Sequence, residues 1–162
     1  MTKRFLFLIT ALSMVILSAC TGSSSKKSDP EQEKAAFQAS LTEADTVIVS
    51  AMCEQFFGLM SSENYDQAFA MISELDDENR LAYLSDDTKQ GLKNRFSSFT
   101  IDKVELFECV FNSPFDNLFR YVVTTKSIDQ NDNALFFRFA FNPVKIDGSW
   151  YLTLRTAPMK RD

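Results

Sequence analysis

Apolar residues in the first half of the chain recur at helical spacing. Between residues 49 and 60 they fall at i, i+3, i+4, i+7, i+8 and i+11, one face of an amphipathic helix: Val49, Met52, Cys53, Phe56, Phe57 and Met60. Ser40 and Glu43 stand in capping-box spacing just upstream. A shorter helix with the same periodicity is predicted from Tyr65 to Ile72.

An acidic stretch, residues 74–78, separates these helices from a third. We interpret the stretch as a solvated loop or helix end, with weak cation binding as the alternative. The third helix is predicted near residues 86–96, with Ser85 as its N-cap.

The second half of the chain has the composition of strands. Residues 99–111, 118–127, 134–146 and 149–156 are rich in Phe, Val, Ile, Thr and Tyr, and turn residues separate them. Asp147-Gly148 is a two-residue hairpin signal. Helices followed by such strands predict an α+β fold, with N-terminal helices packed on a curved antiparallel sheet of about four strands.

Two hairpin centres set the expected register. The centre at Asp147-Gly148 places Phe141 opposite Leu154 and Phe139 opposite Thr156. A preceding hairpin centred on Asn131 places Tyr121 opposite Phe141 and Val123 opposite Phe139.

Because side chains alternate along a strand, this register sorts the sheet into two faces. The apolar face, expected to pack on the helices, has Phe119, Tyr121, Val123, Leu135, Phe137, Phe139, Phe141, Trp150, Leu152 and Leu154. The opposite face, expected to meet solvent or a partner, has Arg120, Thr124, Lys126, Arg138, Asn142, Tyr151, Thr153 and Arg155.

The N-terminus has the three parts of an export signal: Lys3 and Arg4, an apolar run over residues 5–17, and small residues before a cysteine. Leu17-Ser18-Ala19-Cys20 resembles the bacterial lipoprotein signal, which implies cleavage after Ala19 and a diacylglycerol on Cys20. An uncleaved membrane helix is the alternative, but the run is shorter than the roughly 20 residues that span a bilayer. Two or three lipid chains on one cysteine make a lasting anchor.

These features divide the chain into a signal peptide (1–19), a lipidated cysteine with a flexible tether (20–40) and one domain (41–162). Thr21 follows the cysteine where an aspartate is associated with retention at the inner membrane. Resemblance to that sorting rule implies the outer membrane if the source is Gram-negative, and the single plasma membrane if it is Gram-positive.

Charge and composition exclude several classes of function. The leader holds two basic residues and no acidic one, so the mature chain would have 15 basic against 22 acidic residues and a net charge of −7 instead of −5. Nucleic acid is therefore not an expected partner. The chain has no histidine, which excludes Ser-His-Asp and Cys-His catalysis and the usual zinc sites.

Three helices followed by a curved antiparallel sheet that ends in Val144 to Leu152 resemble the nuclear transport factor two-like superfamily, with its SnoaL-like members and cystatin-like cone. The segment from Phe56 to Ala68 is similar to that family's first two helices. The resemblance implies a cone whose mouth can hold a small apolar molecule. Catalytic members similar to ketosteroid isomerase use a carboxylate base with a tyrosine or a protonated acid. Tyr121 is expected to face inward, but no inward position on the three registered strands carries Asp or Glu. We therefore expect no enzyme.

Two cysteines remain after lipidation, Cys53 on the helix stripe and Cys109 late in the first strand. A disulfide between them is chemically permitted in an oxidising compartment. The alternative is that both are buried apolar thiols. The sequence has no Cys-x-x-Cys motif, so no redox catalysis is expected.

Residues 129–133 match the opening of a calcium loop, but the match ends there. The sixth position is Ala134 where glycine is needed, and the twelfth is Ala140 where a glutamate belongs. We interpret the segment as a polar hairpin turn and expect neither a metal nor a cofactor.

Two hypotheses for function remain, with an isomerase- or dehydratase-like enzyme as a distant third. In the first, a non-catalytic envelope lipoprotein binds a protein partner, or a second copy of itself, through the sheet face around Arg120, Arg138 and Arg155; the alternative is a solvated face. In the second, the cone binds a small apolar ligand. That cavity would be lined by Phe57, Tyr121, Phe137, Phe139 and Trp150, and its alternative is an ordinary core.

Overall fold

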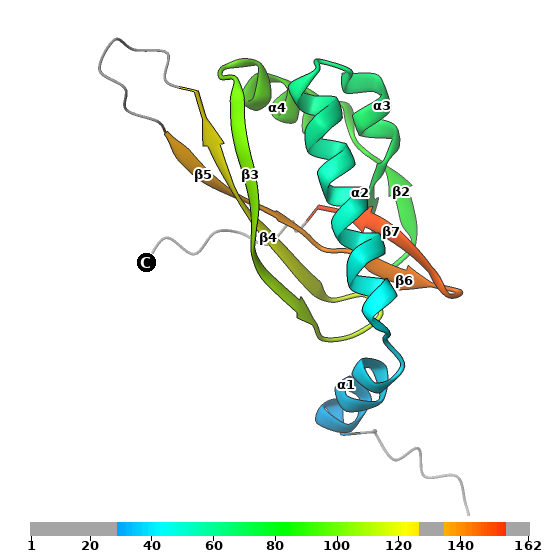
Figure 1. Ribbon diagram of the computed structural model, residues 1–162. Helices are drawn as coiled ribbons and strands as arrows, with labels where there is room; N and C mark the ends of the chain where they lie inside the picture. Colours follow the sequence, from blue (N-terminus) through cyan, green and yellow to red (C-terminus); the bar gives the residue numbers. More distant parts are fainter. Residues whose placement is uncertain (1–28, 127–134, 155–162) are drawn as a thin grey trace, which may run out of the picture.

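The computed structural model describes residues 29–126 and 135–154, where helices lie against one side of a curved sheet (Figure 1). The helix α2 (Glu43–Ser61) crosses the sheet, and α3 (Tyr65–Ala70) and α4 (Asp86–Ser97) lie near its C-terminal end. The helix α1 (Pro30–Ala39) stands at the opposite end. The predicted α+β class is confirmed.

The long helix α2 buries the predicted stripe. Five of its six members are buried: Val49, Cys53, Phe56, Phe57 and Met60. The capping box is formed by Thr42 and Asp45, so the prediction of Ser40 and Glu43 was wrong by two residues. Ser40 instead follows α1, and its hydroxyl donates to the Phe37 carbonyl.

The predicted third helix and its cap are confirmed. The Ser85 hydroxyl accepts a hydrogen bond from the Thr88 backbone N–H at 3.2 Å, and the helix α4 starts at the next residue. Such an N-cap satisfies a backbone donor that the first turn of a helix leaves without a partner. Leu92 and Phe96 are the buried residues of α4.

The acidic stretch is part of a hairpin, not only a loop. Strand β1 (Ile72–Leu75) pairs antiparallel with β2 (Leu81–Tyr83), and the turn between them is closed by Asp76, whose carboxylate accepts from the Arg80 N–H and guanidinium. The shorter helix predicted to reach Ile72 ends at Ala70, because Ile72 already belongs to β1.

Three strands form the longer part of the sheet, in the order β3 (Ile101–Phe111), β4 (Asn117–Thr125), β5 (Phe136–Phe141). Phe119 lies opposite Phe141, and Tyr121 lies opposite Phe139. The predicted pairing of β4 with β5 was therefore displaced by two residues. Because a displacement of two residues preserves the alternation of side chains, the predicted faces of β4 and β5 are still correct.

The remaining strands are ordered β2-β1-β7-β6. Strand β6 (Val144–Ile146) and β7 (Ser149–Thr153) form the predicted hairpin, with positive φ angles of 50° and 80° at Asp147 and Gly148. Both central residues of a type I′ turn require such angles. The predicted pair of Phe141 with Leu154 is confirmed as an isolated bridge that links the two groups of strands, whereas Thr156 lies outside the described residues.

The sheet is larger and more mixed than predicted. Strand β1 pairs with β7 in parallel, with Ile72 opposite Leu152. The predicted strand over residues 134–146 is divided into β5 and β6 at Pro143, which has no N–H to give to a neighbouring strand.

Two face assignments need correction. Leu135 was predicted to be inward but is 70% exposed, because it precedes β5, before the first inward residue, Phe137, that packs on Phe96 of α4. Thr153 was predicted to be outward but is buried, and its hydroxyl donates to the Asn142 carbonyl next to the break in the strand.

Part of the predicted tether is helical. The helix α1 starts after Asp29, whose side chain accepts from the Glu31 N–H, and Pro30 occupies its first turn. Phe37 is partly buried against the core, and the Gln38 side-chain amide donates to the Phe111 carbonyl at 2.7 Å. A proline directly after an N-capping aspartate signals the start of a helix. The polar composition of the segment had favoured a flexible tether instead.

Candidate functional site

The aromatic residues predicted to line a ligand cavity pack against one another instead. The Phe57 ring lies 5.3 Å from the Tyr121 ring and 5.6 Å from the Phe139 ring, measured between centroids. Phe137 is half-buried beside Phe99, and Trp150 lies apart from the group, against Phe111. Rings therefore occupy the space that the cavity hypothesis assigned to a ligand.

Tyr121 places a polar group in the interior of the described part of the chain. The Tyr121 side chain is 1% exposed, and its hydroxyl makes no hydrogen bond of good geometry within the described residues. Burial raises the pKa of this phenol, so it stays neutral at physiological pH. A ketosteroid-isomerase-like site also needs a carboxylate base that reaches the substrate. The side chains nearest this hydroxyl are Ser50 and Cys53, and the carboxylate that acts on it, Glu54, is exposed on α2.

The two cysteines are free thiols in the structure, so the predicted disulfide is not present. Cys53 is buried and Cys109 is exposed on the edge strand β3. Burial raises the pKa of the Cys53 thiol to about 12, which leaves almost no thiolate at neutral pH. Since the thiolate is the nucleophilic form, Cys53 is chemically inert.

A buried ion pair that the sequence reading missed ties α2 to the last hairpin. The carboxylate of Asp45 is 7% exposed, and its Oδ1 accepts from Lys145 Nζ at 2.6 Å and from Trp150 Nε1 at 2.7 Å. Its Oδ2 accepts from the Thr42 N–H at 2.7 Å. The hydrogen bond from Lys145, followed by that from Thr42, holds the pKa of Asp45 well below its usual range. The sequence did contain one signal for this buried carboxylate. Asp45 stands four residues before Val49, so it lies on the same helix face as the apolar stripe.

The outer face of the sheet, opposite the helices, carries the predicted arginines. Arg120 forms an ion pair with Glu108 at 2.5 Å, and the Arg138 guanidinium lies 5.1 Å from the centre of the Phe107 ring. The register pairs Val122 with Arg138, so Arg120 and Arg138 are diagonal neighbours on adjacent strands. The third predicted arginine, Arg155, lies outside the described residues.

Large apolar side chains also lie on this outer face. Phe107 is 58% exposed, and Phe136, which pairs with Thr124, is 74% exposed. Exposed aromatic rings beside arginine are typical of the centres of protein interfaces. The sequence reading placed the arginines here but assigned neither aromatic residue to a face. Alternation with Phe137 already indicates the position of Phe136, whereas a bulge between Leu106 and Glu108 conceals that of Phe107.

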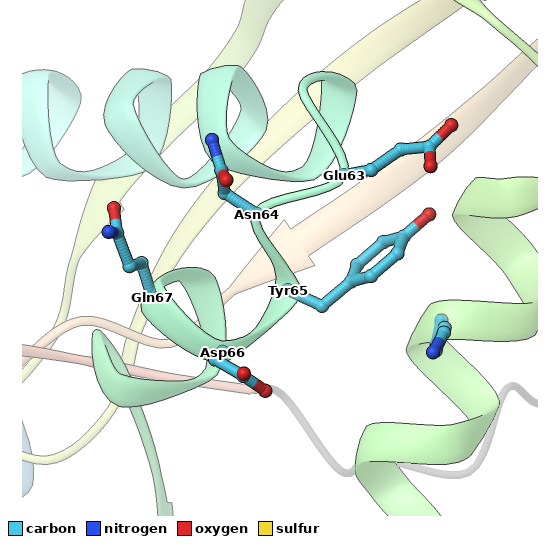
Figure 2. A pocket seen from close by; sticks show the side chains of 6 residues that line it. Glu63, Asn64, Tyr65, Asp66 and Gln67 are labelled. Carbon is cyan, nitrogen blue, oxygen red and sulfur yellow. The ribbon is translucent and has the colours of Figure 1, made fainter.

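A polar surface pocket of about 310 Å³ lies between α3 and α4 (Figure 2). The Tyr65 and Glu63 side chains point toward α4, whereas Asn64 and Gln67 lie on the other side of the turn. Lys93 of α4 places its ammonium 5.3 Å from the Tyr65 ring centre. These side chains do not converge on one point, so we assign this pocket no chemistry.

The described residues contain no group of three or more His, Cys, Asp or Glu side chains that could hold a metal ion. The calcium-like segment 129–133 lies outside them. In the same part of the chain, none of the helices has both the length and the apolar character needed to cross a membrane.

Several solved structures resemble this chain. A protein from Campylobacter jejuni, provisionally named an NTF2-like transpeptidase, matches with a TM-score of 0.40 and 14% identity, over 65% of this chain and 97% of that one. No family model matches the sequence, and no curated protein matches it. A likeness of this size assigns neither a family nor an activity to the chain.

Proposed function

We propose that this protein is a lipid-anchored, non-catalytic interaction module of the cell envelope, and that its outer sheet face binds a protein partner. The observation that carries the proposal is the grouping of Phe107, Phe136 and Arg138 on that exposed face. The partner surface would supply an apolar side chain to the two rings and a carboxylate to Arg138, because arginine pairs bidentately with carboxylates.

Three features of the interior support a non-catalytic role. The aromatic rings fill the cone, the buried thiol is protonated, and the buried carboxylate of Asp45 is engaged by Lys145 and Trp150. Among the described residues, neither this thiol nor this carboxylate is therefore available as a nucleophile or a base.

The proposed lipid anchor on Cys20 predicts that the protein is found in the membrane fraction. Ala19 and Cys20 lie outside the described residues, and their role rests on the sequence of the leader. Replacing Cys20 by serine should release the protein from the membrane fraction, because the lipid attachment is lost. Fractionation and mass measurement of the full chain test this: membrane association of Cys20→Ser at the wild-type level would contradict the anchor.

The partner surface predicts where cross-links form. A photo-reactive phenylalanine analogue placed at Phe136 in the full chain in cells should yield a discrete cross-linked product. The same analogue at Tyr83, which is 95% exposed on β2, is the matched control and should yield none. Arg138→Glu should remove the Phe136 product, whereas Lys34→Glu on α1 should retain it.

The mass of the product distinguishes the occupants of the face. A product of twice the chain mass would identify a second copy, and a different mass would identify another protein. Equal cross-linking at Phe136 and Tyr83, or a product insensitive to Arg138→Glu, would contradict the proposed surface.

A further inference from the structure

A second pocket, of about 330 Å³, lies where α2 and α4 end and β3 begins. We call it the corner pocket. Its apolar lining comes from Met60, Phe96, Phe99 and Ile101, and serine and threonine side chains complete it. Its volume lies at the lower end of the range of sites for small molecules.

The groups that line the corner pocket contribute negative charge only. Glu63 is the single charged side chain that lines it, and it follows the C-terminus of α2 at Ser61. The C-terminus of α4, at Ser97, borders the same pocket. The C-terminal end of a helix carries a partial negative charge, so two helix ends and one carboxylate create a negative potential over a pocket that polar and apolar groups line together.

The nearby cations do not line the corner pocket, although Lys93 and Glu63 both line the neighbouring one. The Lys93 ammonium lies over the Tyr65 ring in the neighbouring pocket of Figure 2. The Arg95 guanidinium lies 4.5 Å from the Phe137 ring centre and is not part of the lining. Lys126, whose N–H donates to the Thr100 carbonyl, does not line the pocket either.

Glu63 has a backbone that few residues adopt. Its φ angle is +58°, in the left-handed region, and its N–H donates to the Met60 carbonyl at the end of α2. A residue in the left-handed conformation commonly ends a helix, and the Asn64 N–H also donates to the Leu59 carbonyl, as in a helix-terminating turn. This turn places the Glu63 side chain at the edge of the corner pocket.

From this geometry we propose that the corner pocket binds a small apolar amine. The ammonium group would lie against Glu63 and the two helix ends, and the hydrocarbon or aromatic body against Phe99 and Ile101, the partly buried apolar residues of the lining. This proposal is independent of the lipid anchor and of the outer sheet face.

The test uses the full-length chain in non-ionic detergent micelles, with isotope-labelled methionine methyl groups followed by NMR. Met60 lines the corner pocket and Met71 does not, so the two methyl groups serve as reporter and internal control. The probes are 2-phenylethylammonium, the neutral 2-phenylethanol and the anionic 3-phenylpropionate, which share one ring and differ in charge.

Phenylethylammonium should shift the Met60 signal saturably and leave Met71 in place. The carboxylate probe should bind about ten-fold more weakly, because it loses the attraction of Glu63 and the helix ends. Glu63→Gln should reduce this preference to about three-fold, whereas Glu31→Gln on α1 should leave it unchanged. Ser97→Phe, which fills the pocket from its rim, should abolish the shift.

Three results would overturn the proposal. The first is the absence of a saturable Met60 shift with phenylethylammonium. The second is equal affinity for all three probes. The third is a charge preference that Glu63→Gln does not change.

Discussion

Replacing Phe56 by alanine is expected to lower the free energy of unfolding by about 3 to 5 kcal/mol. Phe56 is fully buried on α2, and its ring contacts four others, those of Phe57, Phe96, Phe139 and Phe141, at centroid distances of 5.4 to 6.1 Å. Its removal would leave a cavity at the centre of the core that several elements would have to collapse to fill. Urea unfolding followed by circular dichroism measures the effect.

Phe136→Ala is the matched control for Phe56→Ala. It removes the same side chain from a position that is 74% exposed, and it should change the free energy of unfolding by about 0.5 kcal/mol or less. Equal losses for the two variants would show that Phe56 is not the centre of the core.

Replacing Asp45 by asparagine is expected to cost about 3 kcal/mol, because it leaves the Lys145 ammonium largely buried without its carboxylate. The double variant Asp45→Asn with Lys145→Met should recover part of that loss, since no buried charge then remains without a partner. A double variant whose loss equals the sum of the two single losses would show that the pair is not coupled.

The pH dependence of stability gives a second measure of Asp45. Its pKa is lowered in the folded protein, so its contribution is fully present above the unfolded-state pKa of about 3.9. The contribution is lost as the pH falls below that value toward the folded-state pKa. Below about pH 4, the wild-type free energy of unfolding should therefore fall more steeply than that of Asp45→Asn.

The elements that the sequence predicted are those with a local signal. The stripe from Val49 to Met60 repeats over three turns of α2, and Asp147-Gly148 specifies its turn type through the backbone of two adjacent residues. Such patterns depend on neighbours along the chain, and this explains why they could be recognised without a structure.

The elements that were missed depend on distant partners. Strand β1 has four residues, and its pairing with β7 joins Ile72 to Leu152, so nothing near Ile72 indicates a strand. The displacement by two in the pairing of β4 with β5 has a related cause. Alternation fixes the face of a strand but not its position along the partner.

The candidate sites were predicted in part. Arg120 and Arg138 were placed on the correct face because that inference needs only alternation. The ring packing around Phe57 could not be read from a list of aromatic residues, because cavity and core have the same composition and differ only in how the side chains fill space. The corner pocket has no sequence signal, since three elements contribute to it.

The parallel pairing of β1 with β7 also determines the order in which the protein can fold. Strand β7 lies between β1 and β6, and it comes from the last part of the described chain. Contacts between residues so far apart in sequence slow folding, because the intervening chain must be ordered before they form. A nascent chain that ends before Ser149 lacks β7, the partner strand of β1. The core between the helices and the first strands is therefore completed only after the C-terminal hairpin has formed.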